Sequence, residues 1–122
     1  MFEIGPVVGT DRNAYSWRND TVFTWILANP HRVDAFYYPG NHIYLERYDD
    51  GRWELIGLYG FLETDPVRLR LGDTLSASVR LSNDAFPESG WYRVHSRVYR
   101  DTALTLLWPL GNRVSSAVWV GP

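Results

Sequence analysis

The chain has 122 residues and a net charge of −2, so neither nucleic acid nor an anionic membrane is expected as a partner. This length suits one folded unit with a buried core, and we expect a single domain over residues 1–122. The chain has no cysteine, which excludes a domain held together by disulfide bonds. Aromatic residues make up 16% of the chain, a share that favours β-structure because such side chains suit a pleated, half-buried surface.

The amino-terminal residues, Met1 to Pro6, contain neither a basic segment nor a long apolar run, so no signal peptide is visible. No other stretch has the apolar length of a membrane span. We therefore expect a protein of the cytoplasm, a mature fragment or a part of an assembled particle, and the sequence leaves the compartment otherwise open.

Turn-forming residues recur about every ten positions, a spacing typical of a β-sandwich or barrel. The first half of the chain is expected to contain a strand over Phe2–Val8, a loop over Gly9–Asn13 and a strand over Thr21–Leu27. A hairpin follows, with strands over Asn41–Tyr48 and Arg52–Leu58. Its turn is Asp49-Asp50-Gly51, because Asp and Gly tolerate the positive φ of a tight turn.

The second half alternates apolar and polar residues most clearly over Thr74–Leu81, where Leu75, Ala77 and Val79 share one face. The short strand Val67–Leu71 before it is expected to direct Val67, Leu69 and Leu71 inward. Further strands are expected over Trp91–Arg100, over Thr102–Trp108 as a strand or extension, and over Val114–Val120. The chain as a whole therefore predicts an all-β antiparallel sandwich.

A turn at Ser89-Gly90 leads directly into the strand that contains Tyr92. Immunoglobulin-like sandwiches place a tyrosine at this point, two residues before the position of the second cysteine, which is Val94 here. We expect the Tyr92 ring to point inward and its hydroxyl to bond a backbone carbonyl.

Several motifs occur in an order that resembles bacterial immunoglobulin-like domains, in particular the group related to the intracellular proteinase inhibitor of bacilli. These motifs are Trp25-Ile26-Leu27-Ala28-Asn29-Pro30, Tyr38-Pro39-Gly40, Asp50-Gly51-Arg52-Trp53, Leu71-Gly72-Asp73-Thr74, Gly90-Trp91-Tyr92-Arg93-Val94 and Val114 to Val120. The resemblance covers the chain from Thr21 onward, apart from an apparent insertion over Thr102–Asn112. It implies an immunoglobulin-like sandwich of about seven to nine strands and protein binding, without a transferable active site.

Two strands of this fold are expected to combine their outer faces into one surface. An inward Tyr92 places Val94, Ser96 and Val98 inside, and an inward Ile43 and Leu45 leave the alternate residues of that strand outside. The strands are neighbours in immunoglobulin-like topology. The candidate binding residues are Trp91, Arg93, His95, Arg97, Tyr99, His42, Tyr44, Glu46 and Tyr48.

This surface has two interpretations. It is either a solvated sheet face joined by cross-strand pairs such as Glu46 with Arg93 or Arg97, or a binding interface, where Tyr, Trp and Arg are enriched. Trp53 is expected in or beside the core. The strand Thr21–Leu27 is apolar on both faces, so either amino-terminal residues or another subunit must cover one; we expect the former.

Catalytic chemistry is not expected. His31, His42 and His95 lie in no nucleophile motif, and there is no phosphate-binding glycine loop. His42, His95 and Glu46 could in principle ligate zinc, but they lack the spacing of a zinc motif and are expected to be ordinary surface residues. We therefore expect no enzyme activity, no cofactor and no metal.

Three functions remain open. The first is a non-enzymatic interaction or structural module that binds another protein or its own copies, such as an accessory subunit of a virion or surface filament. The second, implied by the resemblance, is proteinase inhibition through the loop Asn83–Ser89 or Gly57–Pro66. The third is carbohydrate binding by exposed aromatic rings.

Overall fold

The computed structural model describes residues 5–31, 33–37, 43–59, 65–82 and 85–122. Its regular structure in these ranges is almost entirely β, with one short 3-10 turn, η1 (Leu110–Asn112). The strands are β1 (Val7–Thr10), β2 (Ala14–Ser16), β3 (Val22–Ala28), β4 (Phe36–Tyr37), β5 (Ile43–Asp49), β6 (Arg52–Tyr59), β7 (Val67–Arg68), β8 (Thr74–Arg80), β9 (Gly90–Ser96), β10 (Val98–Tyr99) and β11 (Val118–Gly121). The predicted all-β class is therefore confirmed. No helix within the described ranges has the length and apolarity needed to cross a membrane.

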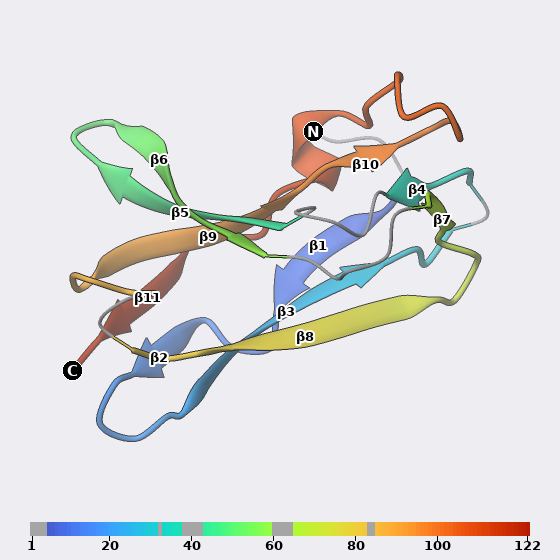
Figure 1. Ribbon diagram of the computed structural model, residues 1–122. Coiled ribbons are helices and arrows are strands. Elements are labelled where there is room, and N and C mark those ends of the chain that lie inside the picture. Colours follow the sequence, from blue (N-terminus) through green and yellow to red (C-terminus); the bar gives the residue numbers. More distant parts are fainter. Residues whose placement is uncertain (1–4, 32, 38–42, 60–64, 83–84) are drawn as a thin grey trace.

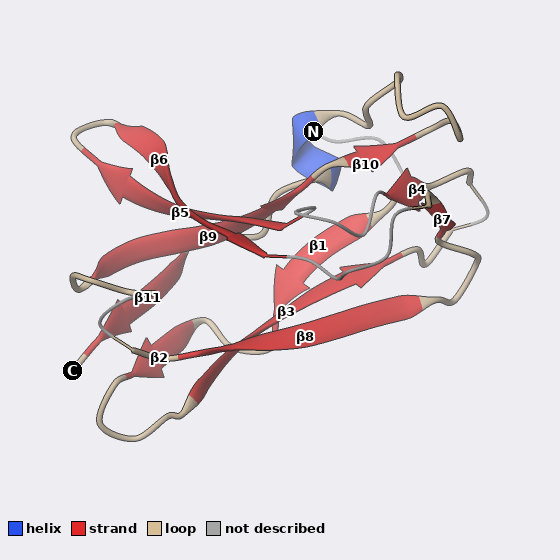
Figure 2. Ribbon diagram, in the orientation of Figure 1, coloured by secondary structure: helices blue, strands red, loops and turns tan. Residues whose placement is uncertain are grey.

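Two layers of strands form the body of the molecule (Figures 1 and 2). One layer is a five-stranded sheet in the order β2-β11-β9-β5-β6, and the other is the sheet β1-β3-β8. A third small sheet, β10-β4-β7, lies at one end. All pairs are antiparallel except β2 with β11, which is parallel.

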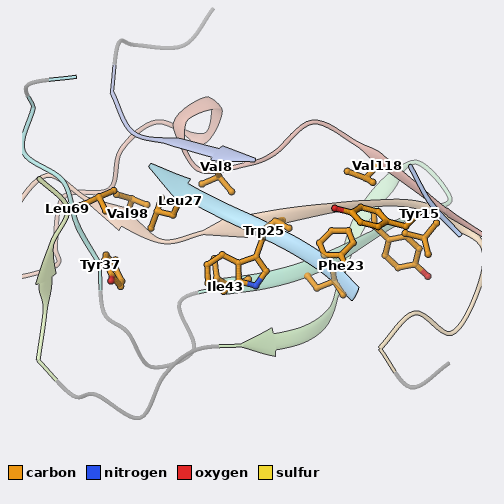
Figure 3. Packing of buried hydrophobic residues seen from close by; sticks show 14 of the residues in the cluster. Val8, Tyr15, Phe23, Trp25, Leu27, Tyr37, Ile43, Leu69, Val98 and Val118 are labelled. Carbon is orange, nitrogen blue, oxygen red and sulfur yellow. The ribbon is translucent and has the colours of Figure 1, made fainter. Parts of the chain in front are cut away.

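The core lies between the two layers (Figure 3). Phe23, Trp25 and Leu27 point inward from β3 and meet Ile43 and Val118 from the opposite layer. The sequence, with apolar residues on both faces of this strand, left its inward face open. Burial of these large side chains is the main stabilising contribution, at about 1.5–3 kcal/mol for each fully buried one.

The tyrosine of β9 has the predicted position. Tyr92 is fully buried, and its hydroxyl donates a hydrogen bond to the backbone carbonyl of Glu88. Val94, Ser96 and Val98 are also buried, which confirms the inward face of this segment. The bond links β9 to the turn that leads into it.

The hairpin predicted at Asp49-Asp50-Gly51 forms between β5 and β6. Asp50 and Gly51 have φ values of 49° and 85°, the left-handed conformation that a tight two-residue turn requires. The pairing contains a β-bulge between Leu45 and Glu46, opposite Ile56. This extra residue shifts the alternation of β6 after Leu55.

The structure corrects several strand boundaries. Gly9 and Thr10, expected in a loop, extend β1 because they pair with β3, and the short strands β2 and β4 were not anticipated. No strand forms over Thr102–Trp108, where the one ladder contact is an isolated bridge of Leu107 with Tyr99. Of the expected strand Phe2–Val8, residues 2–4 lie outside the described residues, Gly5 and Pro6 are not in a strand, and Val7 and Val8 begin β1.

Leu71 is half exposed, although the sequence placed it inside. The Asp73 amide donates to the Arg70 carbonyl, and Gly72 has a φ of 82°, so a turn begins before Leu71 and removes it from the strand. Residues 1–4, part of the expected cover of the second face of β3, lie outside the described residues, and Thr24 and Ile26 on that face are half-buried. β1 pairs along the edge of β3 instead of lying over it, and Val22 stays exposed.

Candidate functional site

The side chains that the sequence singles out gather on the solvent side of the five-stranded sheet. β5 pairs with β9, with Tyr44 opposite His95 and Glu46 opposite Arg93, so the two predicted strands are neighbours. β6 and β11 add further side chains to the same side. We call this surface the outer face; its residues are Tyr44, Glu46, Tyr48, Trp53, Leu55, Leu58, Trp91, Arg93, His95 and Trp119.

An ion pair forms the centre of the outer face. Arg93 Nε donates to Glu46 Oε1 at 2.7 Å, which is one of the two cross-strand pairs named for the solvated-face interpretation. The two side chains are only 17% and 13% exposed, so water screens them little. The Arg93 guanidinium also lies 4.6 Å from the centre of the Trp53 ring. Arg93 is thus fixed by an acid and an aromatic face at once.

His95 continues this network toward the loop before β11. Arg113 donates from its guanidinium to His95 Nε2 at 2.8 Å, so Nε2 is the acceptor and the ring proton is on Nδ1. Nδ1 lies 3.5 Å from Glu46 Oε2, a contact that becomes an ion pair when the ring is protonated. Burial lowers the pKa of His95, and the neighbouring Arg113 lowers it further, against the opposing charge of Glu46. The ring is therefore neutral at pH 7.

Two aromatic contacts extend the network. The Tyr44 ring packs edge-on against His95, with 5.5 Å between centres, and the Arg97 guanidinium lies 5.4 Å from the centre of Tyr44. Arg97 stands at the break between β9 and β10, where the predicted continuous strand is interrupted. Tyr99 follows this break and pairs with Phe36 in the small sheet, so it lies on a different sheet from the outer face.

The margins of the outer face carry large exposed apolar groups. Trp91 and Trp119 are 48% and 41% exposed and pack edge-to-face, with 5.4 Å between ring centres. On the other margin, Leu55 and Leu58 of β6 are 53% and 49% exposed. Large side chains exposed in neighbouring strands form a surface of the kind that contacts other molecules.

Sequence reasoning did not assign some of these residues to the surface. Trp119 alternates with the buried Val118 and Val120, so its outward direction was readable from the sequence. Leu58 faces outward because of the bulge at Ile56. In the sequence, only Gly57 indicates this bulge, since a glycine within a strand often marks one.

The expectation that Trp53 packs in or beside the core is wrong, because it is neither part of the buried cluster nor packed against it. Trp53 is half-buried on the outer face, edge-on to Tyr48 and beneath Arg93. It lies on the β5–β6 hairpin, which projects from the body of the sandwich (Figure 1), so the opposite layer does not reach it.

The remaining sequence-predicted sites, the candidate zinc ligand His42 and the two inhibitory loops, lie wholly or partly outside the described residues. Because His42 lies outside them, the sequence-based zinc hypothesis is not examined by the structure. Within the described ranges, no group of three or more His, Asp or Glu side chains is arranged to hold a metal.

The loop candidates for proteinase inhibition are also described only in part. In the segment Asn83–Ser89, Phe86 is fully buried between Phe23 and Tyr92. In Gly57–Pro66, the first three residues belong to β6. Outside these anchored parts, residues 87–89 and 65–66 are exposed.

No protein-family model matches this chain, and no curated protein sequence matches it. Among solved structures, a β-glucosidase from Listeria innocua aligns with 96% of this chain at 16% identity and a TM-score of 0.42. The same enzyme in complex with glucose gives 15% identity and a TM-score of 0.41. The chain spans only 16% of that enzyme's length. Similarities at this level assign neither a fold family nor an activity.

Proposed function

We propose that this protein is a non-enzymatic interaction or structural module with an immunoglobulin-like arrangement of strands. It binds another protein, or its own copies, through the outer face. A role as an accessory subunit of a larger assembly, such as a virion or a surface filament, fits such a module.

Three features support an immunoglobulin-like arrangement. The central strands β11, β9 and β5 are adjacent in one sheet, while β1, β3 and β8 form the other. The amino-terminal segment divides between the two sheets, with β1 beside β3 and β2 parallel to β11. The Tyr92 hydroxyl bonds the chain four residues upstream, as in a tyrosine corner.

The observation that carries the proposed binding role is the composition of the outer face. Its centre is a partly buried network of Glu46, Arg93 and His95, and its margins expose Trp91 and Trp119. Trp, Tyr and Arg dominate binding energy at protein interfaces. Because Arg93 is already held by Glu46 and Trp53, little side-chain entropy would be lost on binding.

The test uses tagged wild-type chain and tagged Trp91→Ala/Arg93→Ala as baits in extracts of the source organism. Untagged wild-type chain is added to each extract so that binding to a second copy is also detected. Partners are identified by mass spectrometry, purified and titrated calorimetrically. We expect the dissociation constant to rise at least about tenfold, the size of a hot-spot loss. Val22→Ala, on the exposed side of the other layer, is the control and is expected to bind as the wild type does. Unchanged binding by the double variant would refute the outer face as the binding surface.

Polysaccharide binding is a second candidate, supported by the exposure of Trp91 and Trp119. Their rings are inclined by 75°, whereas a flat platform for successive sugar units needs parallel rings, so protein binding is favoured. Titration of tryptophan fluorescence with soluble polysaccharides separates the two functions. A saturable shift that Trp91→Ala abolishes would favour the sugar.

Proteinase inhibition remains a prediction from the sequence resemblance. An assay against a panel of serine proteases tests it directly. Inhibition that survives Trp91→Ala/Arg93→Ala would place the function in a loop and not on the outer face.

A further inference from the structure

The start of β6 carries two opposite charges that have no partner among the described residues. Arg52 and Glu54 flank Trp53, and neither forms an ion pair or a side-chain hydrogen bond within the described chain. Their cross-strand neighbours in β5 are Asp49 and Arg47 respectively. Each of these two cross-strand pairs therefore joins an acidic and a basic residue.

β6 is also the edge of the five-stranded sheet, and no described strand pairs with its second side. The β5–β6 hairpin projects from the sandwich (Figure 1), so the described elements leave this edge accessible. An edge strand presents unpaired backbone N–H and C=O groups and is a template for another strand. The exposed Leu55 and Leu58 add apolar surface at the same edge.

We propose that β6 pairs antiparallel with β6 of a second copy of this chain, about a twofold axis at Trp53. In this register Arg52 lies opposite the partner's Glu54, and Glu54 lies opposite the partner's Arg52. Four residues then lie side by side across the four strands, with charges that alternate in sign. They are Asp49, Arg52, the partner's Glu54 and the partner's Arg47. Opposite charges directly across a sheet stabilise the pairing.

Charge and pleat together favour this register over the neighbouring ones centred on Arg52 and Glu54. A twofold axis at Arg52 or at Glu54 would place like charges directly opposite each other, which is destabilising. An axis between two residues would set an outward side chain against an inward one, which the pleat of a continuous sheet does not allow. With the axis at Trp53, Leu55 faces the partner's Gly51, at which a Cβ would meet nothing within 4 Å.

The dimer joins the two five-stranded sheets into one and places both outer faces on the same side. This inference rests on the proposed function, because it assumes that the chain acts by binding protein. It adds that one such partner is a second copy of the chain. The residues that select it, Arg52 and Glu54, are distinct from Trp91 and Arg93, so the two proposals can fail separately.

The experiment measures self-association by sedimentation velocity over a concentration series. We expect the wild-type chain to dimerise. Arg52→Glu and Glu54→Arg should each raise the dissociation constant at least about tenfold, because each substitution places like charges opposite each other at two positions of the dimer. A 1:1 mixture of the two variants restores both pairs in a heterodimer, so its dissociation constant should return to within about threefold of the wild-type value. The mixture contains only proteins already measured alone, so a folding defect cannot imitate this recovery.

Arg80→Glu, which makes the same charge change on β8 in the other layer, is the control and should not restore association when mixed with Glu54→Arg. A wild-type chain that is monomeric at every concentration overturns the proposal, as does a mixture that associates no better than its components. A dimer that resists both charge reversals but is lost in Trp91→Ala/Arg93→Ala also overturns it, while leaving the outer face as the binding surface.

Discussion

His95 is held between a donor and an acid, and this position determines its protonation. Arg113 donates to Nε2, and Glu46 lies near Nδ1, in a site from which water is largely excluded. Burial and the nearby Arg113 lower the pKa of His95, even though Glu46 acts in the other direction. The neutral ring therefore joins the sheet to the segment before β11, because Arg113 also donates to the Trp108 carbonyl.

This arrangement predicts a specific dependence of stability on pH. Since the folded state lowers the pKa of His95, the unfolded chain binds its proton more readily as the pH falls through 6.5, the ordinary value for histidine. The stabilising contribution is present above that pH and is lost below it. We expect the free energy of unfolding, from urea titrations at pH 7.5 and 5.5, to fall more for the wild type than for His95→Gln. An equal fall in both proteins would contradict this role, and the comparison removes the contributions of His31 and His42.

At the scale of single elements, the β5–β6 hairpin determines how the edge of the sheet is presented. Its turn depends on positive φ values at Asp50 and Gly51, and its bulge at Ile56 redirects Leu58 outward. The turn was predictable because Asp and Gly accept this conformation. The bulge was not, because its position depends on how β5 and β6 pair with each other.

A glycine substitution tests the turn. At Gly51 the φ of 85° strains any residue with a Cβ, although the space around it is open, so Gly51→Ala should lower the free energy of unfolding by about 1 kcal/mol. Gly9→Ala is the matched control, since its added Cβ also meets nothing within 4 Å and no positive φ is required. We expect the control to be neutral or slightly stabilising in the same urea titration. Equal losses in both variants would show that the turn conformation is not the cause.

For the whole molecule, the core residues and the residues of the proposed binding surface lie on opposite sides of the same strands. Tyr92 and Val94 of β9 face the core, while Trp91 and Arg93 face outward. Phe86 reaches into the core from the segment before β9 and packs against Phe23 and Tyr92, which joins the two layers. Substitutions on the two sides should therefore have very different effects on folding.

Phe86→Ala should lower the free energy of unfolding by about 3–5 kcal/mol, because it removes a fully buried ring and leaves a cavity. Trp91→Ala should lower it by no more than about 1.5 kcal/mol, the value of an aromatic pair, since the ring is half exposed beside Trp119. Chemical denaturation of both variants measures the difference. Losses of similar size would show that the outer face is part of the stabilising core.

The sequence by itself determined the local features of this protein. The alternation in β8 and β9 determined which side chains face inward, because successive residues of a strand point to opposite sides. The Asp50-Gly51 turn and the inward Tyr92 were equally readable, since each depends on residues close together in the chain.

Only the tertiary structure decided which distant residues share a surface. It brought Glu46 to Arg93 and Arg113 to His95, placed Trp53 on the outer face instead of in the core, and separated Tyr99 from that face by the break at Arg97. Within the described ranges, it also left β6 as an edge strand whose Arg52 and Glu54 have no ion-pair partner. These features depend on strand order, register and a bulge, which arise from contacts between segments far apart in the sequence and not from the pattern within one segment.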